Sequence, residues 1–369
     1  MKITDVEAFN LRLPDIQART DSSQDALLIR ITTDAGIVGW GEVDGCPSVV
    51  KAIIDAPYSH TLVTGLKSLL IGENPLETRR LWDKMYRATL FYGRGGAVVQ
   101  AMAGIDIALW DIKGKALGKP IVELLGGAIR SRMRVYSSNM FQFSVEDTVA
   151  RAKHAVDTGH TGVKFGWEPF GQSEAMDLKY VEAIRRAIGD ETDFMLDVGL
   201  IWDAKTTIRR SSLFEPYNLF WIEEPLHPDD YAGYGKVSAG CSQRIAAGEE
   251  ECTVVGFERL IDEGGIDVVQ IDLTRTGFTQ AMRIADYAAS RRRKVCNHNF
   301  TTDINTAASL HFLCALENAL VMEYCVEPGE LSKNLAVEPV KITDGFAQLP
   351  DAPGLGVEPR MDIIEKYLA

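Results

Sequence analysis

Six ionisable side chains follow one another at nearly constant spacing through the second half of the chain. Each stands at the end of a short apolar run, and the six are Asp197, Glu223, Glu249, Asp272, His298 and Glu323. The steps between them are 26, 26, 23, 26 and 25 residues. One strand and one helix of a (β/α) barrel take about that many residues, so these side chains are expected at equivalent places on one rim. In barrel enzymes, the rim formed by the carboxyl ends of the strands carries catalysis.

The first three of these side chains are carboxylates on adjacent predicted strands. Asp197, Glu223 and Glu249 would repel one another and lose solvation if they converged without a cation. A site made only of carboxylate oxygens suits a hard ion, Mg²⁺ first and Mn²⁺ second, and the lack of Cys and His there argues against zinc. The alternative is that each acid caps the helix that follows it. Because all three recur at near-equal spacing, we interpret them as a metal site.

Asp272 and His298 lie on the next two predicted strands. A carboxylate beside an imidazole fixes its tautomer and raises its basicity, which makes a general base, although a histidine held in the core is an alternative. Lys164 ends an earlier predicted strand and would neutralise a substrate carboxylate from the barrel mouth. Arg275 is a candidate anion clamp, because its planar fork suits carboxylates. Trp167 is expected to shape the substrate pocket or to pack in the core.

Short apolar runs alternate with helix-like stretches from about residue 126 to residue 335. Helical periodicity is clear over residues 145–157, 176–188 and 279–290. Eight alternations of this kind predict an α/β fold in which a parallel sheet closes into a barrel. The apolar runs cover residues 134–136, 162–164, 194–196, 219–222, 244–246, 268–271, 294–296 and 320–322.

The first 125 residues and the last 34 differ from this pattern. Strands are predicted over residues 2–13 and 26–43, and helical patterns follow, which indicates a small α+β domain. The turn-rich segment 336–369 is expected to return to that first domain. The predicted organisation is therefore an α+β domain over 1–125, a barrel over 126–335 and a returning segment over 336–369.

Composition limits the partners and the compartment. The 369 residues carry a net charge of −13, which argues against a nucleic-acid partner because phosphate binding needs a basic face. No apolar run reaches the roughly 18 residues of a membrane span, and the first residues lack a signal-peptide pattern. Six cysteines without a CxxC pair are expected to be buried free thiols in a reducing compartment. A cytoplasmic protein with no membrane partner is the expectation.

Several motifs resemble those of a known family, the enolase superfamily, and within it the mandelate racemase subgroup. The resemblance extends over nearly the whole chain. The motifs are GWGE at 39–42, GIDIALWD at 104–111, WIEEP at 221–225, AGE at 247–249, QIDLTR at 270–275, NHN at 297–299 and PGLG at 353–356.

The resemblance implies a fold, a cofactor and roles for the candidate residues. It implies an N-terminal capping domain and a modified (β/α)7β barrel, with Mg²⁺ held by the three carboxylates named above. Asp272 and His298 would be the base, and Glu323 a hydrogen-bond donor or acid near the enediolate. Capping loops near residues 14–25 and 44–58 would close over the substrate and set specificity. Homo-oligomers are common in this subgroup, so a homo-oligomer is expected.

Two positions depart from the family pattern. Many members carry Lys-x-Lys at the end of the second barrel strand, where the second lysine is a base on the other face of the substrate. This chain has Lys164-Phe165-Gly166 there, so that lysine is missing. Members also often have Asn two residues after the first metal ligand, where this chain has Gly199.

The missing lysine bears on the reaction. Racemisation or epimerisation needs an acid and a base on opposite faces, and Gly166 weakens that scheme, although Lys164 could serve. β-Elimination of water needs one base, and His298 could return the proton to the leaving hydroxyl when the geometry is syn. We therefore expect a lyase, a Mg²⁺-dependent dehydratase that converts a small sugar acid into a 2-keto-3-deoxy acid. The alternatives are a racemase or epimerase, a cycloisomerase acting on an acid or its lactone, and a non-catalytic sugar-acid-binding barrel.

Overall fold

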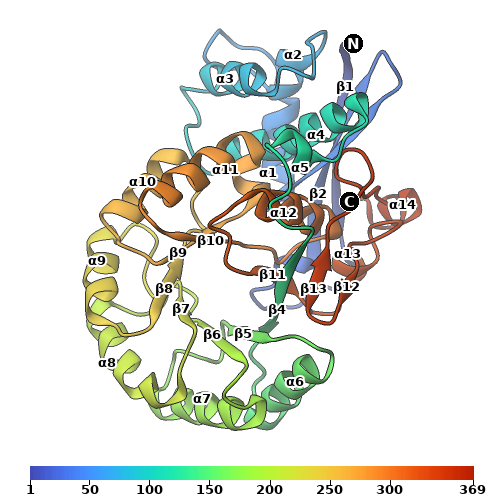
Figure 1. Cartoon of the computed structure of the whole chain (residues 1–369). Helices are drawn as coiled ribbons and strands as arrows, with labels where there is room; N and C mark the ends of the chain where they lie inside the picture. Colours follow the sequence, from blue (N-terminus) through green and yellow to red (C-terminus); the bar gives the residue numbers. More distant parts are fainter.

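Eight parallel strands form the central barrel of the computed structural model, which describes all 369 residues (Figure 1). The strands pair in sequence order from β4 to β10, and β11 pairs with β4. Between β10 and β11 the barrel closes through a parallel bridge of Val295 with Ala319. The α/β barrel predicted from the sequence is confirmed. Its strands are β4 (Arg132–Met140), β5 (Gly162–Gly166), β6 (Asp193–Asp197), β7 (Trp221–Glu223), β8 (Arg244–Ala247), β9 (Val268–Ile271), β10 (Lys294–Asn297) and β11 (Met322–Cys325).

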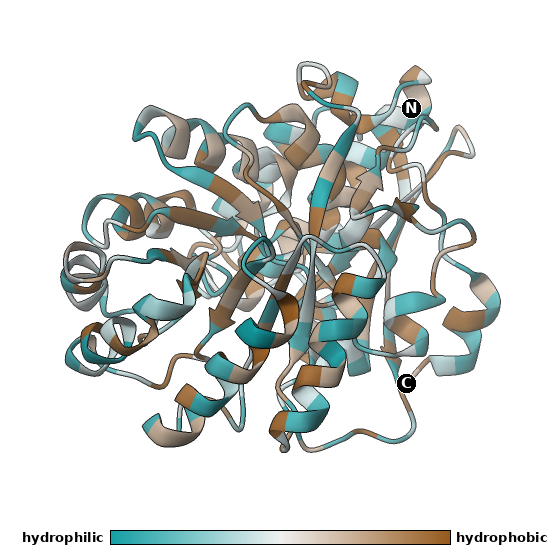
Figure 2. Ribbon diagram, turned by 60° about the horizontal axis from the view of Figure 1, so that its bottom comes forward, coloured by the Kyte–Doolittle hydropathy of each residue, from teal (hydrophilic) through white to brown (hydrophobic).

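Seven helices connect these strands and surround the barrel (Figure 1). They carry apolar residues on the side of the strands and polar residues toward solvent (Figure 2), as amphipathic helices of a barrel must. The first begins at a capping side chain, since Ser144 Oγ accepts the N–H of Asp147 at 3.0 Å. The helices are α6 (Val145–Asp157), α7 (Glu174–Ile188), α8 (Ala204–Phe214), α9 (Tyr231–Gly240), α10 (Val254–Asp262), α11 (Leu273–Ser290) and α12 (Asp303–Ala315).

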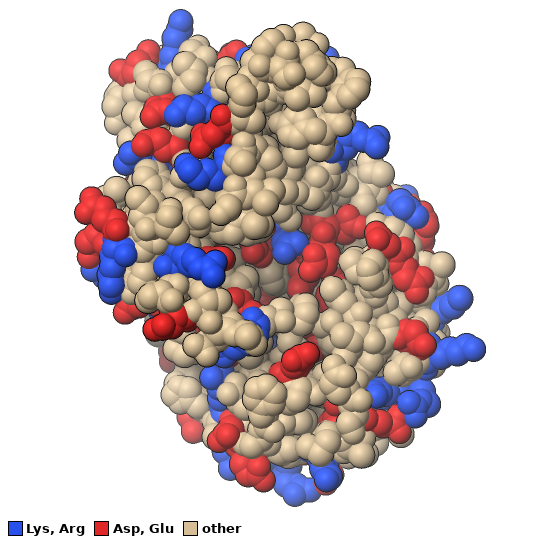
Figure 3. Space-filling model, turned by 180° about the vertical axis from the view of Figure 1, so that it is seen from behind, with Lys and Arg blue, Asp and Glu red and all other residues tan.

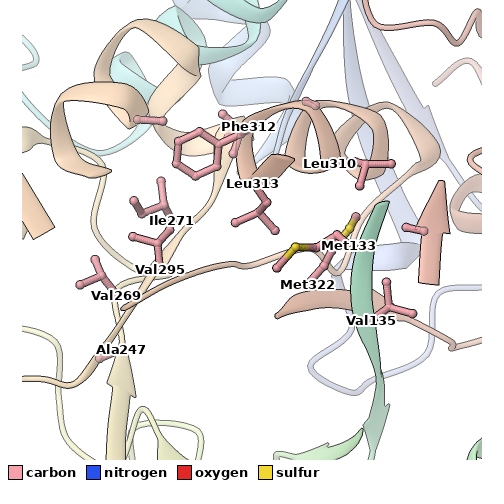
Figure 4. Close-up of a cluster of buried hydrophobic side chains, with 14 of the residues drawn as sticks. Met133, Val135, Ala247, Val269, Ile271, Val295, Leu310, Phe312, Leu313 and Met322 are labelled. Carbon is pink, nitrogen blue, oxygen red and sulfur yellow. The ribbon is translucent and has the colours of Figure 1, made fainter. Parts of the chain in front are cut away.

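Alternate residues of the barrel strands face two separate cores. Neighbours such as Val268 and Val269 belong to different buried clusters, because successive side chains of a strand point to opposite faces. In the outer core, side chains of β9 and β10 lie close to Leu313 of α12 (Figure 4). In the inner core, the fully buried Tyr136 and Trp221 fill the barrel. This inner layer forms a solid floor beneath the rim on which the carboxyl ends of the strands meet.

The eighth strand departs from its predicted position. The apolar run at 320–322 predicted the strand there, but β11 begins at Met322 and continues to Cys325. Glu323 therefore lies inside its strand, whereas Glu249 lies two residues beyond the end of β8. The six ionisable side chains thus do not all end their strands, as the sequence pattern had suggested.

A three-stranded antiparallel sheet with five helices precedes the barrel and lies at the top of Figure 1. Strand β3 lies directly against helix α4, and a Cβ built on Gly41 would stand 2.0 Å from the carbonyl oxygen of Gly104. No side chain fits at this contact, which explains the glycine in the GWGE motif. The elements are β1 (Ile3–Arg12), β2 (Asp25–Thr33), β3 (Val38–Val43), α1 (Pro47–Asp55), α2 (Leu66–Leu70), α3 (Thr78–Ala88), α4 (Ala97–Leu117) and α5 (Ile121–Leu124).

Glu42, at the end of β3, fixes this N-terminal sheet to the barrel. The side chain is fully buried, and its oxygens accept the N–H of Thr302 at 3.2 Å, the Thr302 hydroxyl at 2.8 Å and the N–H of Asn305 at 2.9 Å. These donors belong to the first turn of α12, where the helix dipole favours a negative group. Burial nevertheless raises the pKa of Glu42 to about 8.

Two further buried carboxylates, both on α4, make contacts of the same kind. Asp106 accepts the N–H of Thr279 at 2.8 Å, close to the kink of α11 at Gly277. Asp111 accepts the N–H of Leu355 at 2.8 Å, so it binds the chain beyond the barrel. The GIDIALWD motif therefore serves to join the domains.

The chain after residue 335 contacts both the barrel and the N-terminal sheet. Strand β13 (Phe346–Gln348) pairs antiparallel with the start of β4 and with β12 (Ile342–Thr343). Leu368 forms a bridge with Leu11 of β1, after helix α14 (Met361–Tyr367). A short helix, α13 (Glu330–Lys333), precedes this segment.

The six cysteines are all free, but only four of them are buried. Cys46 is exposed and Cys241 is half-buried, so the expectation of uniformly buried thiols was wrong for these two. Cys46 immediately precedes α1 at the surface, where no apolar layer covers it. None of the helices combines the length and the apolar character that crossing a membrane requires.

We predict that Glu42→Ala lowers the free energy of unfolding by about 2–4 kcal/mol, because three buried donors lose their acceptor. Thermal or urea unfolding measures this change.

Glu42→Gln tests the pH dependence. The folded-state pKa of about 8 lies above the ordinary value of 4.5, so ionisation of Glu42 weakens the fold as pH rises through this window. Between the pKa values of 4.5 and about 8, the free energy of unfolding of the wild type should fall by up to about 1.4 kcal/mol per pH unit relative to that of Glu42→Gln. A difference in unfolding free energy that does not change with pH would contradict this.

Candidate active site

Asp197, Glu223 and Glu249 converge at the rim of the barrel. All three are buried, and they offer oxygens that lie within 4.8 Å of one another. In the strand register Gly166 is level with Asp197, and Asp197 with Glu223, so β-sheet pairing holds these residues side by side. Burial, Glu223 and Glu249 together raise the pKa of Asp197 well above its usual value, and burial raises that of Glu249 to about 8. The triad is therefore an unfavourable concentration of negative charge.

The donor set of this triad fits a hard divalent cation. Glu249 Oε2 is buried without a hydrogen-bond partner, so this oxygen is available to a ligand. Asp197 is oriented by the N–H of Gly199, which donates to Oδ1 at 2.9 Å. Glu223 Oε2 accepts the indole N–H of Trp221 at 2.8 Å. Three carboxylates with no nitrogen or sulfur ligand among them suit Mg²⁺ or Mn²⁺.

Lys164 lies beside the triad in the middle of β5 and not at its end, as the sequence pattern had suggested, because the strand continues to Gly166. Its ammonium group pairs with Glu223 and, at 2.6 Å, with Glu323 Oε1, and only 4% of the side chain is exposed. Burial opposes its charge, but Glu223, Glu323 and Asp197 raise its pKa well above the usual value. Lys164 is thus a fixed cation shared by two carboxylates.

Glu323 faces the same space from β11. Its Oε1 accepts the hydroxyl of Ser138 at 2.7 Å, and its Oε2 accepts the N–H of Asn299 at 2.7 Å. Burial alone would raise the pKa of Glu323, but Lys164 and His298 lower it to about 2. An ionised carboxylate accepts hydrogen bonds, so this arrangement does not favour the donor or acid role that the resemblance implied.

His298 and Asp272 form a hydrogen-bonded pair just beyond the carboxyl ends of the neighbouring strands β10 and β9. His298 Nδ1 lies 2.7 Å from Asp272 Oδ2, and His298 Nε2 lies 3.9 Å from Glu249 Oε2. Asp272 is itself held by Thr274, whose N–H and hydroxyl donate to Oδ1 at 2.7 and 2.6 Å. Asp272 therefore also caps the N-terminus of α11.

The charge of His298 depends on its acidic neighbours. Burial lowers the pKa of the imidazole, but Glu249, the hydrogen bond of Asp272 and Glu323 raise it well above the usual value. Glu249 makes the largest of these raising contributions. Neutralising Glu249 would therefore bring the pKa of His298 back toward the range of a general base.

Four of these side chains line one cavity of about 140 Å³ between the barrel and the N-terminal domain, namely Asp197, Glu249, Lys164 and His298, whereas Glu223, Glu323 and Asp272 lie behind its surface. Figure 3 shows acidic and basic side chains gathered around a hollow between the two domains. Only three of the fifteen lining residues are hydrophobic, so the cavity suits a hydroxylated rather than an apolar molecule. The capping loop over 14–25 contributes Thr20 and Ser22, and the loop that begins at residue 44 contributes Asp44.

Arg275 lies in the cavity wall between two acids. Its guanidinium is 3.1 Å from Glu250 Oε2 and 3.6 Å from Asp44 Oδ2. Burial opposes its charge, whereas Asp44 and Glu250 raise its pKa. Burial also raises the pKa of Asp44, against the lowering effect of Arg275. The charge of the predicted anion clamp is thus already shared within the protein.

Gly166 and Trp167 form the wall next to Asp197. A Cβ built on Gly166 would stand 2.7 Å from Asp197 Oδ2, so in this backbone a side chain at position 166 would displace the carboxylate. Trp167 lines the cavity with φ of 65°, and its ring lies against Gly199. Trp202 is buried and does not line the cavity.

Sequence reasoning missed several residues of the cavity. Glu250 follows Glu249 directly and could have been found from that adjacency, but nothing in the sequence distinguishes Ser138, Asn139, Met140 or Phe300. Asp44 fell only within the predicted specificity loop. His227, in the loop after β7, is 72% exposed and does not line the cavity.

Comparison with known proteins places the chain in a family. Residues 3–126 match the family model for the mandelate racemase / muconate lactonizing enzyme N-terminal domain, and residues 147–363 match that for the enolase C-terminal domain-like family. A D-galactarolactone cycloisomerase from Agrobacterium fabrum is 31% identical over 356 residues, covering 92% of this chain and 90% of that protein. A D-galactonate dehydratase from Verminephrobacter eiseniae is 35% identical over 349 residues, covering 90% and 88%.

A solved structure gives the same result for the whole chain. A racemase from Streptomyces coelicolor A3(2) with bound magnesium superposes with a TM-score of 0.88 at 25% identity, and each chain is covered completely, at 100%. Both family models match in order along a chain whose N-terminal domain caps a closed barrel. This protein belongs to the mandelate racemase subgroup of the enolase superfamily.

Proposed function

We propose that this protein is a Mg²⁺-dependent lyase that removes the proton next to the carboxylate of a sugar acid and eliminates water, giving a 2-keto-3-deoxy acid. The observation that carries the proposal is the His298–Asp272 pair beside the carboxylate triad, with no second base across the cavity. The similarity to a D-galactonate dehydratase supports the same class of substrate and reaction.

His298 is the proposed base. Its Nδ1 is engaged with Asp272 at 2.7 Å, which leaves Nε2 to face the cavity and take the α-proton. The same nitrogen then returns that proton to the hydroxyl on the neighbouring carbon, so the C–O bond breaks and water leaves. The resulting enol becomes the 2-keto acid. Both steps take place on one face of the substrate, as a syn elimination requires.

The residues across the cavity support elimination over racemisation. Racemisation needs a proton donor on the second face, but Gly166 has no side chain, and a Cβ there would collide with Asp197. Lys164 is held between Glu223 and Glu323, where its ammonium can bind an anionic group but is committed to two partners. We therefore assign Lys164 to binding the charge that develops on the substrate carboxylate.

Asp197, Glu223 and Glu249 would hold the Mg²⁺ ion. When bound, the ion would supply positive charge to the substrate carboxylate and so acidify the neighbouring C–H. The unpartnered Oε2 of Glu249 and the crowding of the three carboxylates support this assignment.

Cycloisomerisation is the second candidate reaction. It begins with the same proton abstraction and differs only in the leaving group, and the similarity to a D-galactarolactone cycloisomerase favours it. Incubation of candidate acids and lactones in D₂O with Mg²⁺, followed by NMR, separates the reactions. Loss of water identifies the dehydratase, ring opening without loss of water identifies the cycloisomerase, and no deuterium uptake would indicate a binding protein.

We predict that His298→Asn lowers kcat for dehydration by about 10²–10⁴-fold, the usual contribution of a positioned base. The α-proton of the bound acid should then cease to exchange with D₂O. His227→Asn is the matched control, because this histidine is exposed and lies outside the cavity lining. Wild-type turnover or exchange in His298→Asn would disprove the assignment.

We predict that Mg²⁺ stabilises the wild type much more than it stabilises Glu249→Gln. Without Mg²⁺, Glu249→Gln should melt at a higher temperature than the wild type, because it removes one of three crowded carboxylates. Saturating Mg²⁺ at about 100 times its Kd should stabilise the wild type by about 2.7 kcal/mol and Glu249→Gln much less. Differential scanning calorimetry measures both effects, with the exposed Glu263→Gln as control. Equal Mg²⁺ shifts in both proteins would argue against the metal site.

A further inference from the structure

We propose that the cavity accepts a substrate with one carboxylate and an uncharged, hydroxyl-bearing remainder, and that Asp44 of the capping domain binds one of those hydroxyls. Sugar acids with one carboxylate are aldonates, and those oxidised at both ends are aldarates. The inference rests on the proposed function and deepens it, because it states which of these two classes the site takes.

Every basic side chain in the cavity lining already has an acidic partner within the protein. The only basic side chains there are Lys164, Arg275 and His298. Lys164 pairs with Glu223 and Glu323, and Arg275 lies between Asp44 and Glu250. His298 is hydrogen-bonded to Asp272 at 2.7 Å. The metal triad, with Lys164 beside it, is therefore the one place prepared for a substrate carboxylate, and a second carboxylate elsewhere in the cavity would find no free positive charge.

The Asp44 carboxylate is nearly buried and lacks a hydrogen-bond donor within the chain. Only 11% of the side chain is exposed, yet it accepts no hydrogen bond within the chain, and its nearest cation is Arg275 at 3.6 Å. A nearly buried carboxylate without a donor is poorly solvated and gains from any hydroxyl that reaches it. Because Asp44 lines the cavity, a substrate hydroxyl is the donor that its position fits.

The position of Asp44 relative to the base also matters. Asp44, Asp272 and His298 offer atoms within 4.8 Å of one another. A second cation at this group is disfavoured, because the Arg275 guanidinium already lies beside Asp44 and the His298 Nδ1 is engaged with Asp272. A hydroxyl held by Asp44 would instead lie close to His298, so this contact would also position the carbon chain for proton abstraction.

The same wall would reject a second carboxylate. An aldarate seated with one end at the triad would bring its other charge into a cavity of about 140 Å³ in which Asp44 and Glu250 share one arginine. Like charges in a poorly solvated space repel strongly, so recognition here works by exclusion as well as by attraction.

Two measurements on the Mg²⁺-loaded protein test the inference. The first compares aldonates with aldarates of the same configuration, by kcat/KM in the wild type and by calorimetric Kd in His298→Asn, which keeps bound acid intact. We expect kcat/KM to be about a hundredfold higher for the preferred aldonate than for its matched aldarate. We expect the Kd of the aldonate to be about a hundredfold lower. Equal or stronger binding of the aldarate would overturn the inference, whatever the variants do.

The second measurement uses Asp44→Asn, with Asp229→Asn as control because Asp229 is 87% exposed and outside the cavity lining. Asp44→Asn should weaken aldonate binding about tenfold, mainly through a higher KM. The ratio of kcat/KM for the aldonate to kcat/KM for the aldarate should fall at least tenfold. A deoxy analogue that lacks the bound hydroxyl should lose its sensitivity to this substitution. An unchanged preference in a folded Asp44→Asn protein would overturn the role of Asp44.

The two proposals fail in different ways. Dehydration or α-proton exchange of an aldarate at the rate of the aldonate would sink the inference and leave the proposed function intact. If neither acid exchanges its α-proton, the proposed function fails, and the calorimetric comparison still decides which class binds. If neither acid binds, both are overturned.

Discussion

The crowding of buried carboxylates around one point of the barrel rim is the constraint on which the site depends. Asp197, Glu223 and Glu249 each offer an oxygen that lies within 4.8 Å of the other two. Glu323 and Asp272 lie near the same point, and very few basic side chains separate these five carboxylates. Such a cluster lowers the stability of the fold, because burial and mutual repulsion both oppose ionisation of the carboxylates. The protein offsets this repulsion by placing Lys164 and His298 within the cluster and by supplying hydrogen-bond donors such as Ser138 and the N–H of Gly199. The Mg²⁺ ion that we propose at the triad would offset it further.

Much of this arrangement could be predicted from the sequence, because a barrel repeats. The equal spacing of Asp197, Glu223 and Glu249 places them on one rim once the strands are assumed to be parallel. In the structure, β6 and β7 pair in the register that sets Asp197 level with Glu223. Local helix signals were equally strong, and helix α6 spans the predicted residues 145–157. These features depend on periodicity, which a sequence displays directly.

What could not be predicted depends on contacts between distant segments. The sharing of Arg275 between Asp44 and Glu250 joins residues more than 200 positions apart, and no local pattern encodes it. Strand β11 begins at Met322, where its pairing with Val135 of β4 starts, and this pairing between distant segments exists only in the closed barrel. The collision that a side chain at Gly166 would cause with Asp197 is a property of the strand pairing and not of either residue alone.

The contacts that join the two domains affect the order in which the molecule can be built. Glu42 and Asp111 belong to the first third of the chain, but their partners Thr302 and Leu355 belong to the last. A ribosome delivers the chain from its N-terminus, so the N-terminal sheet is complete long before these partners exist. Until then its acidic groups remain hydrated by water, and the apolar surface around them stays uncovered. Newly made chains should therefore pass through a stage that chaperones can recognise, which ends only when α12 and the later segment around Leu355 have emerged and docked.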